Sequence, residues 1–441
     1  MGYPSMPNYN QIADTLRCYA QLKHEYGSKG IEPILVKVEK EMQAAVARLK
    51  KLPIDAALAK KEPNTYKDIL ALRPRANHRL WESFDAKAYE ERIAGAFIGR
   101  CIGNVLGAPV EFYDIGRMER IALENKQAFP PTQHWKRVPD MLEKRYQTTP
   151  RSAYTLEGMD SVGTDDDLIY TQIGLLIAEE YGLDFTTDDV GKAWIKYLPF
   201  ACTAEDIALK NLKKGVPAKK AADIDNPYCE WIGADIRSDP WGYMAPGLPE
   251  KAARMAYVDA YLSHRRQGIY GEMYFSAAIA AAFAVDDPIE ALKLGLNEIP
   301  RDCAMAREVR WALSVAPKIK NYKEARAAME KRYECADFSN SFKGMHPVHT
   351  INNAALTIWG ITIGKKDFSK VIGETVAMGM DNDCTAATAG SIVGAVVGKK
   401  GIPAHWYNKF NNTVHTYLIG EKSFKIDDIL RRFATMAKQA F

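Results

Sequence analysis

The sequence predicts an all-α protein. Apolar residues recur at helical spacing through most of the 441-residue chain, and runs of small residues mark helices that pack closely against their neighbours. No segment shows the alternating Val, Ile and Thr pattern that is typical of a half-buried strand. A composition of 47% hydrophobic and 26% charged residues is that of an ordinary globular protein. The length suits one large body or two to three domains.

Charge and cysteine usage exclude several classes of function. A formal net charge of +4 is small for this length, and no dense stripe of Lys and Arg with interleaved aromatic residues points to nucleic acid. The seven Cys residues are scattered, odd in number and never spaced Cys-x-x-Cys, which favours reduced thiols over disulfides or a zinc site. The N-terminus shows no apolar core of a signal peptide, so we expect a cytoplasmic protein.

Two amphipathic helices are expected near the N-terminus, over residues 12–26 and 34–52. Three prolines between residues 53 and 74 then interrupt the helical pattern. We therefore predict that residues 1–88 form a helical extension that covers or caps the main body. A free-standing module that binds a partner is the alternative.

Four glycines, at every fourth position from Gly95 to Gly107, share one face of the next predicted helix. Another backbone is expected to approach such a face closely. The segment is apolar enough to be mistaken for a membrane helix, but Arg100 and Asn104 interrupt the apolar run. Glu111, just beyond the expected helix end, is an acid available to a nearby site, and a solvated surface Glu is the alternative.

Three consecutive aspartates, Asp165, Asp166 and Asp167, follow Thr164 and precede an apolar helix expected over residues 168–179. Acids favour helix N-termini through the helix dipole, so simple capping is one explanation. One Asp satisfies that need, whereas three in a row repel one another. This cluster is therefore a candidate cation site.

Two further aspartates, Asp381 and Asp383, precede a long run of small residues. The run predicts a buried helix whose backbone packs very close to its neighbours, with Asp383 or Thr385 as its N-cap. Helix capping by the two acids is again the alternative. An EF-hand is excluded, because the sixth and twelfth positions of such a loop are Ala386 and Ile392 rather than Gly and Glu.

Burying a carboxylate costs free energy unless a positive charge compensates it. Hard divalent cations can do so, because they take oxygen ligands. The two acidic clusters lie far apart in the chain, and both open apolar helices. We therefore expect them to fold into one shared site that holds more than one divalent cation.

The segment from residue 113 to 162 is irregular and contains several prolines, which is typical of a functional lid or a partly helical loop. Beyond the first acidic cluster, helices are expected over residues 187–197, 204–213, 217–222, 249–261 and 272–285.

Aromatic, Gly, Asp and Arg residues concentrate between residues 227 and 243, which suits a loop that binds a flat polar ligand. A structural Gly/Pro loop is the alternative. His264 and Tyr270 could stack on a ring, although a lone His is more often structural. His346 and His349 resemble half of a metal site, but capping of the helix that follows them is favoured.

With these residues placed, the chain resembles the ADP-ribosylglycohydrolase family from about residue 89 onwards. Four blocks match the family's motifs in order: residues 95–111, 164–178, 233–271 and 349–406. The resemblance implies that residues 89–441 form a catalytic domain, an orthogonal all-α bundle, which the extension over residues 1–88 precedes.

The resemblance also implies a binuclear centre with two Mg²⁺ ions, or Mn²⁺ in their place. Its metal ligands carry over as Thr164, Asp165, Asp166, Asp381 and Asp383. The family's mobile acid falls on Glu111. The ADP-ribose pocket falls on Gly233, Ala234 and His264, with Tyr270 as the candidate aromatic neighbour.

Three positions depart from the commonest family pattern. Asn104 stands where an Asp is usual, Cys384 replaces a Thr whose hydroxyl contacts a metal, and Asp167 replaces a second Thr. A thiol is a poor ligand for a hard cation, so one ion is expected to keep an extra water. A bacterial branch of the family is similar to this chain at Asp167 and Cys384.

The expected activity is metal-dependent hydrolysis of a glycosidic bond at ribose C1, with release of ADP-ribose or a ribosyl product. In this hypothesis Asp383 bridges the metals, and Glu111 gates the site or assists proton transfer. Asp165, Asp166 and Asp381 each hold one metal. The expected partner is an ADP-ribosylated protein or a small ribosylated molecule, with no nucleic acid and no membrane. The alternatives are a hydrolase of a small ribosylated metabolite and a non-catalytic ADP-ribose-binding or structural protein.

Overall fold

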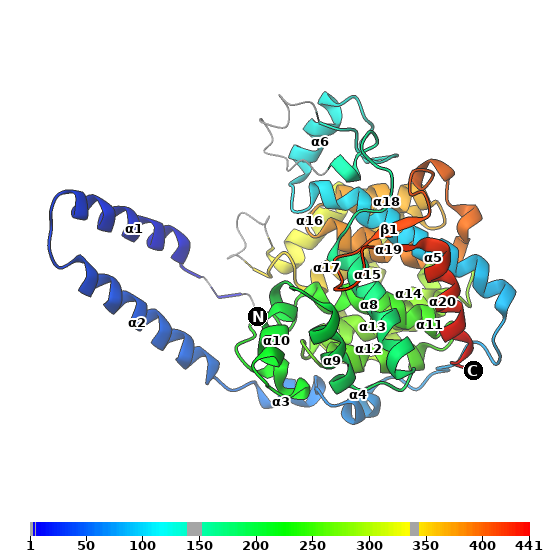
Figure 1. Cartoon of the computed structure of the whole chain (residues 1–441), viewed down its shortest axis with the longest axis horizontal. Helices are drawn as coiled ribbons and strands as arrows, with labels where there is room; N and C mark the ends of the chain where they lie inside the picture. The colour runs from blue at the N-terminus through cyan, green and yellow to red at the C-terminus, as the bar shows by residue number, and fades with distance from the viewer. Residues whose placement is uncertain (1–2, 5, 139–151, 336–343) are drawn as a thin grey trace.

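A computed structural model describes residues 3, 4, 6–138, 152–335 and 344–441. The predicted all-α class is confirmed, because helices make up almost all of the regular structure in these ranges (Figure 1). The exception is an antiparallel ribbon of two short strands, β1 (Thr413–His415) and β2 (Ser423–Lys425), in which Val414 pairs with Phe424. Strands of three residues are too short to produce an alternating pattern that the sequence could reveal.

Two helices cross backbone to backbone at the centre of the body: α5 (Ala86–Gly107) and α19 (Asn382–Val397). A Cβ atom on Gly95 would lie 2.1 Å from the carbonyl oxygen of Gly394, and one on Gly99 would lie 2.2 Å from that of Gly390. Real Cβ atoms do not approach so closely, so only glycine fits at these crossing points. The predicted close packing of both glycine-rich segments is confirmed.

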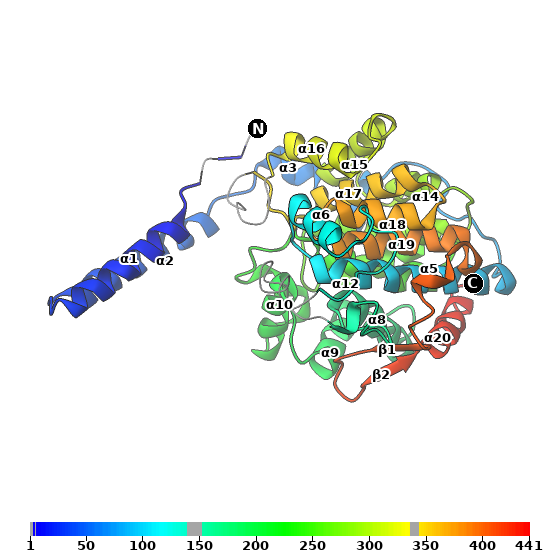
Figure 2. The same ribbon diagram turned by 90° about the horizontal axis from the view of Figure 1, so that it is seen from above.

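Other helices surround this pair in a compact bundle (Figures 1 and 2). Helix α13 packs against α11, α12, α14 and α19, whereas α18 lies between α17 and α19. The helices of the bundle besides α5 and α19 are α6 (Ile115–Glu124), α8 (Asp166–Tyr181), α9 (Thr187–Tyr197), α10 (Thr203–Lys213), α11 (Ser238–Met244), α12 (Pro249–Ala260), α13 (Gln267–Ala282), α14 (Pro288–Gly295), α15 (Ala304–Val315), α16 (Tyr322–Tyr333), α17 (Thr350–Gly364), α18 (Phe368–Ala377) and α20 (Ile426–Lys438).

The first two helices, α1 (Tyr9–Glu25) and α2 (Ile31–Lys50), form a hairpin that extends away from the body in both views (Figures 1 and 2). Neither helix buries a single residue. The prediction that this part of the extension covers the body is therefore wrong. An amphipathic pattern shows that a helix has an apolar face, but it does not say which surface that face meets.

The rest of the extension does lie on the body. It contains α3 (Ala56–Lys61) and α4 (Tyr66–Leu72), and the side chain of Glu62 between them is buried. Glu62 forms an ion pair with Arg266 and accepts a hydrogen bond from the amide of Ala304 at 2.8 Å. Further along, the amides of Leu80 and Trp81 donate to the carbonyl oxygen of Gly247.

One helical stretch among the described residues, Ala86–Val110, is long and apolar enough to cross a membrane. It is the α5 helix with the short turn that follows it, and 89% of its most apolar window is buried inside the protein. Its apolar residues therefore pack in the core of the bundle.

Two irregular segments contain helices, and for residues 113–162 this agrees with the expected partly helical loop. The segment from residue 113 to 162 contains α6, although its residues 139–151 lie outside the described ranges. The segment from residue 227 to 243 forms a 3₁₀ turn, η4 (Ile232–Arg237), followed by α11, and every residue from 232 onwards is buried. Most of this segment is thus packed into the body, and part of it lines the cavity described below: Trp231, Ile232, Gly233 and Ile236.

Candidate metal centre

Three segments that are distant in sequence meet at one cavity of about 610 Å³. They are the end of α5, the start of α8 and the start of α19. The cavity lining consists of acidic, aromatic and small residues: Glu111, Phe112, Thr164, Asp165, Asp166, Tyr170, Phe200, Cys202, Thr203, Glu205, Trp231, Ile232, Gly233, Ile236, Val348, Asp381, Asp383, Cys384 and Tyr417. The structure therefore brings together both acidic clusters and Glu111, as the sequence predicts.

At the start of α8, Asp165 is the N-cap residue, and its carboxylate accepts a hydrogen bond from the amide of Asp167 at 3.2 Å. The side-chain amide of Asn104 donates to Asp165 Oδ1 at 2.8 Å and to Asp167 Oδ2 at 3.1 Å. A neutral donor at position 104 thus holds two like-charged carboxylates side by side. An Asp at this position could not donate to either of them when ionised.

The fully buried guanidinium of Arg100 contacts this cluster and stabilises it. Arg100 donates to Asp239 Oδ2 at 2.6 Å and to the carbonyl oxygen of Asp167 at 2.7 Å, and it lies 3.4 Å from Asp167 Oδ1. It also donates to Thr171 Oγ1 and to the carbonyl oxygen of Ile236. These partners satisfy a charge that would otherwise be costly to bury. From the sequence, Arg100 appeared only as an interruption of an apolar helix.

At the start of α19 the chain turns sharply, with Gly379 and Met380 at positive φ values of 71° and 64°. Asp381 is the N-cap residue, but its side chain makes no capping hydrogen bond. The prediction that Asp383 or Thr385 is the N-cap is therefore wrong. Asp383 lies inside the first turn, and the carboxylate of Asp381 does not cap the helix.

Two carboxylate oxygens in this turn are candidates for cation ligands. Oδ1 of Asp381 and Oδ1 of Asp383 are buried and accept no hydrogen bond from any described residue. A buried carboxylate oxygen normally has a partner. Where no protein atom is that partner, a bound ion is one explanation.

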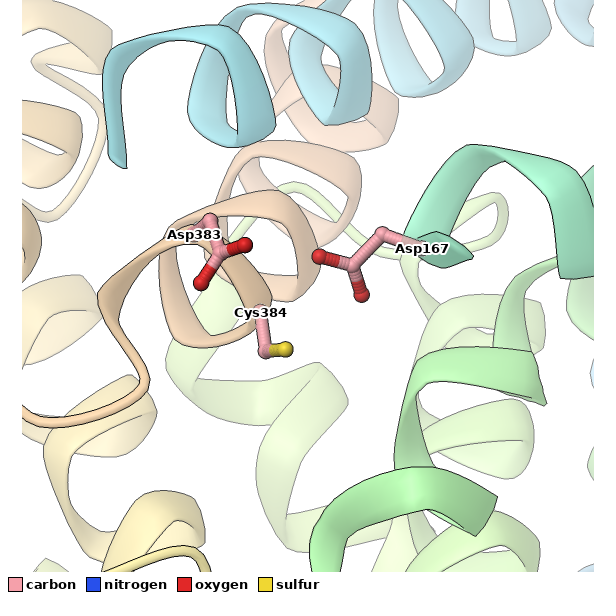
Figure 3. Close-up of side chains that lie close together, drawn as sticks. All are labelled: Asp167, Asp383 and Cys384. Carbon is pink, nitrogen blue, oxygen red and sulfur yellow. The ribbon is translucent and has the colours of Figure 1, made fainter. Parts of the chain in front are cut away.

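The acids fall into two groups that share Asp383. In the outer group, ligand atoms of Glu111, Asp381 and Asp383 lie within 4.8 Å of one another, and Glu111 is partly exposed. In the inner group, ligand atoms of Asp167, Asp383 and Cys384 lie within the same limit, and all three residues are buried (Figure 3). Their side chains converge on the gap between the starts of α8 and α19.

Burial and mutual repulsion raise the pKa values of these acids. The pKa of Asp383 is raised well above its ordinary value by burial and then by the charges of Glu111 and Asp381. Burial is also the main cause that raises the pKa values of Asp166 and Asp381. Burial raises the pKa of Asp167 to about 8, although the nearby Arg100 lowers it. The ionised cluster therefore needs compensating positive charge, which divalent cations supply.

Of the predicted ligand-binding residues, one lines the cavity and three do not. Gly233 lines the cavity, and a Cβ atom there would lie 2.2 Å from Oε1 of Glu205. Ala234, His264 and Tyr270 are fully buried and are not among the residues that line it. The hydroxyl of Tyr270 donates to the carbonyl oxygen of Pro63 in the N-terminal extension. Stacking of His264 or Tyr270 on a ligand ring is therefore not supported by their positions.

Other aromatic side chains line the cavity instead: Trp231, from the segment over residues 227–243 that the sequence analysis expected to bind a flat ligand, and Phe200 and Tyr417, which it did not single out. The ring of Trp231 stacks on that of His346, with centroids 4.1 Å apart and planes at 14°. Phe200 lies against Tyr417, with centroids 4.5 Å apart. Tyr417 follows the two-stranded ribbon's first strand, which explains why helical periodicity gave no signal for it.

His349 has the capping role that the sequence favours. It is the N-cap of α17, and its Nδ1 accepts a hydrogen bond from the amide of Ile351 at 3.2 Å. His349 also lies 3.5 Å from a carboxylate oxygen of Glu230. With these partners it is part of the scaffold behind Trp231.

Comparisons with known proteins agree with this architecture. The sequence model described as ADP-ribosylglycohydrolase matches residues 85–437. A solved structure described as an ADP-ribosylglycohydrolase-related protein complex aligns with a TM-score of 0.52 and 17% sequence identity, covering 80% of this chain and 100% of that chain. At this identity the likeness shows the fold alone. A search of curated proteins gives no match.

Proposed function

Because the chain belongs to the ADP-ribosylglycohydrolase family, we propose that it is a glycoside hydrolase that depends on two divalent cations, Mg²⁺ or Mn²⁺. Its proposed reaction is hydrolysis of the bond at ribose C1 of an ADP-ribosylated substrate, with release of ADP-ribose. The observation that carries the proposal is the meeting of Glu111, Asp381 and Asp383 at the wall of a cavity that also contains Asp165 and Asp166.

The donor set fits hard divalent cations. Thr164, Asp165, Asp166, Asp381 and Asp383 offer oxygen atoms, and two of the carboxylate oxygens lack any other partner among the described residues. When bound, such ions hold the ribose hydroxyls and supply positive charge to a transition state at C1. Asp383 belongs to both acidic groups, which supports the proposal that it would serve as a ligand to both cations.

The remaining residues have roles that follow from their positions. Glu111 is partly exposed at the cavity wall, so it is placed to accept a proton from a water molecule that enters from solvent. Trp231 and Phe200 offer flat apolar surfaces against which a base or the leaving group can lie. Asn104 fixes Asp165 and thereby one side of the cation site.

The direct test is metal-dependent turnover. Chelator-treated protein should not release ADP-ribose from an ADP-ribosylated protein, and added Mg²⁺ or Mn²⁺ should restore release. Asp383→Ala should abolish the restored activity, whereas Asp188→Ala, an exposed acid in the first turn of α9, should not change it. Undiminished turnover by Asp383→Ala would refute the proposed site.

A second substrate class has an observation in its favour. Among the described residues that line the cavity there are six carboxylates but no Lys or Arg. A diphosphate would find no basic side chain in this lining, so the lining also suits a small ribosylated molecule that carries no diphosphate. Parallel assays with ADP-ribosylated peptide and with ribosyl nucleosides distinguish the two classes by their kcat/KM values.

A non-catalytic role on the same scaffold is less well supported. A protein that served only as a scaffold would gain nothing from several buried carboxylates whose pKa values are raised by burial. Calorimetric titration with Mg²⁺ and then with ADP-ribose, combined with the turnover assay, separates binding without hydrolysis from catalysis.

A further inference from the structure

The two acidic groups of the metal centre differ in the kind of donor atom they contain. The outer group offers only carboxylate oxygens, whereas the inner group of Asp167, Asp383 and Cys384 includes a sulfur atom. We propose that the inner group binds a thiophilic divalent cation of the Zn²⁺ class through Cys384 Sγ, while the outer group takes a hard cation such as Mg²⁺. The inference rests on the proposed function in treating these acids as cation ligands, and it revises that proposal at one point: the ion at the inner group is of the Zn²⁺ class in place of a second Mg²⁺ or Mn²⁺.

Ligand softness is the physical basis of this difference. Thiolates prefer Zn²⁺ and related ions, whereas Mg²⁺ and Mn²⁺ prefer oxygen ligands. Zn²⁺ accepts Cys, His and Asp or Glu ligands, and a site with three protein ligands keeps a fourth position for water or substrate. Binding forms a metal–sulfur bond and releases the thiol proton to solvent, so no oxidant or reductant is required. A single centre with one all-oxygen position and one sulfur-containing position would then hold two different metals.

The inner group is built to hold an ion and is not a chance meeting of side chains. Asp383 is 3% exposed, and its Oδ1 has no hydrogen-bond partner among the described residues. Asp167 is completely buried, and Arg100 and Asn104 fix its orientation from two sides. Cys384 follows Asp383 in the first turn of α19, and its side chain points toward the same gap (Figure 3).

Cadmium is a suitable probe, because its bond to a thiolate produces a charge-transfer absorption band in the ultraviolet. The experiment uses the full chain with the exposed Cys18 and the cavity-lining Cys202 replaced by Ser, which leaves the four buried thiols and the half-buried Cys229 in place. Titration of the metal-free protein with Cd²⁺ should produce the band at one equivalent. Cys384→Ser should remove the band and weaken Cd²⁺ binding by roughly tenfold or more.

Two further variants keep the test decisive. Cys101→Ala removes a buried thiol on α5 that is outside the inner group, and it should keep the band. Asp167→Asn should keep the band at high Cd²⁺ concentration but weaken binding, which also covers the case in which Cys384→Ser does not fold. Folding of each variant is checked by circular dichroism.

The outcomes separate this inference from the proposed function. A band that is absent from the parent protein, or that survives unchanged in Cys384→Ser, would overturn the thiolate site even if Mg²⁺-dependent hydrolysis is observed. Conversely, a band that depends on Cys384 supports the inner site even if no ribosyl substrate is hydrolysed. Saturation with Mg²⁺ should leave the band in place, since Mg²⁺ occupies the other group.

Discussion

A Cβ atom on Gly107 would lie 2.4 Å from both the amide nitrogen and the Cα atom of Asp383. Gly107 is the last residue of α5, and Asp383 lies in the first turn of α19. The close backbone contact between the two central helices therefore continues up to the metal centre. Because Gly107 has no side chain, the start of α19 can approach the end of α5 this closely.

Gly107→Ala should consequently weaken cation binding. The added methyl group must push the start of α19 away, and overpacking of this kind costs about 1–3 kcal/mol of unfolding free energy. Gly95→Ala is the matched control, because its methyl group would meet Gly394 at the far end of the same helix pair. Both variants should lower the Tm, but only Gly107→Ala should reduce Mg²⁺ affinity by calorimetry. Equal Mg²⁺ affinity in the two variants would contradict this role of Gly107.

Much of the architecture could be predicted from the sequence because it depends on local periodicity. The glycines of α5 recur at every fourth residue, so they had to share one face, and the small residues of α19 had to face a close neighbour. The two acidic clusters were expected to meet because buried carboxylates need a common counter-charge. These arguments use spacing and composition alone.

Other features depend on three-dimensional contacts that no spacing reveals. The guanidinium of Arg100 meets Asp239 and Asp167, which belong to two other helices. His264 was expected to reach a ligand, yet the fold buries it completely behind the cavity wall. The hairpin of α1 and α2 has a clear amphipathic pattern, but its apolar faces do not meet the body. In each case the missing information was which surface faces which.

The metal-free protein should show a stability that depends on Asp383 and on pH. The pKa of Asp383 is raised well above 3.8, so the folded chain holds a proton that the unfolded chain releases. This contribution to stability is complete below the ordinary Asp pKa and is lost as the pH rises through the folded-state value. Asp383→Asn removes the effect, so the metal-free variant should become more stable than the wild type at higher pH.

Thermal unfolding in chelator between about pH 4 and about pH 8 measures this difference. The Tm of the variant minus that of the wild type should grow with pH and correspond to about 1–3 kcal/mol at the upper end. Excess Mg²⁺ should reverse the sign, because only the wild type retains the carboxylate that we propose binds the cations. A difference that does not change with pH would exclude a raised pKa at this position.

Asn104→Asp should destabilise the metal-free protein and increase its dependence on cations. The substitution replaces the amide that donates to Asp165 and Asp167 with a further carboxylate, so two hydrogen bonds are lost and repulsion is added. We expect a loss of about 2–4 kcal/mol in chelator at neutral pH. Saturating Mg²⁺ should recover most of that loss, and Asn104→Ala, which adds no charge, should recover less. Chemical denaturation with and without Mg²⁺ measures both effects.

Trp231→Leu should weaken substrate binding without slowing the chemical step. Trp231 lines the cavity and stacks on His346, and it belongs to neither acidic group. Loss of a stacking surface costs about 1–1.5 kcal/mol, which corresponds to roughly a tenfold rise in KM with kcat nearly unchanged. Trp311→Leu removes a half-buried Trp of another aromatic cluster, beside Trp359, and should leave KM unchanged. A fall in kcat alone would place Trp231 in the chemistry rather than in binding.

The N-terminal extension should divide into a dispensable part and a structural part. Deletion of residues 1–51 removes the hairpin, which buries no residue, and the exposed Lys50–Asp225 ion pair, which contributes at most about 1 kcal/mol. Tm and turnover should therefore remain close to those of the full chain.

Glu62→Ala should instead lower the unfolding free energy by about 2–4 kcal/mol, because it removes the partner of Arg266 and of the Ala304 amide. Since Arg266 also pairs with Glu230, which is next to Trp231 in the chain, this variant should raise KM as well. A deletion of residues 1–51 that unfolds the protein would show that the hairpin, and not the segment around Glu62, supports the body.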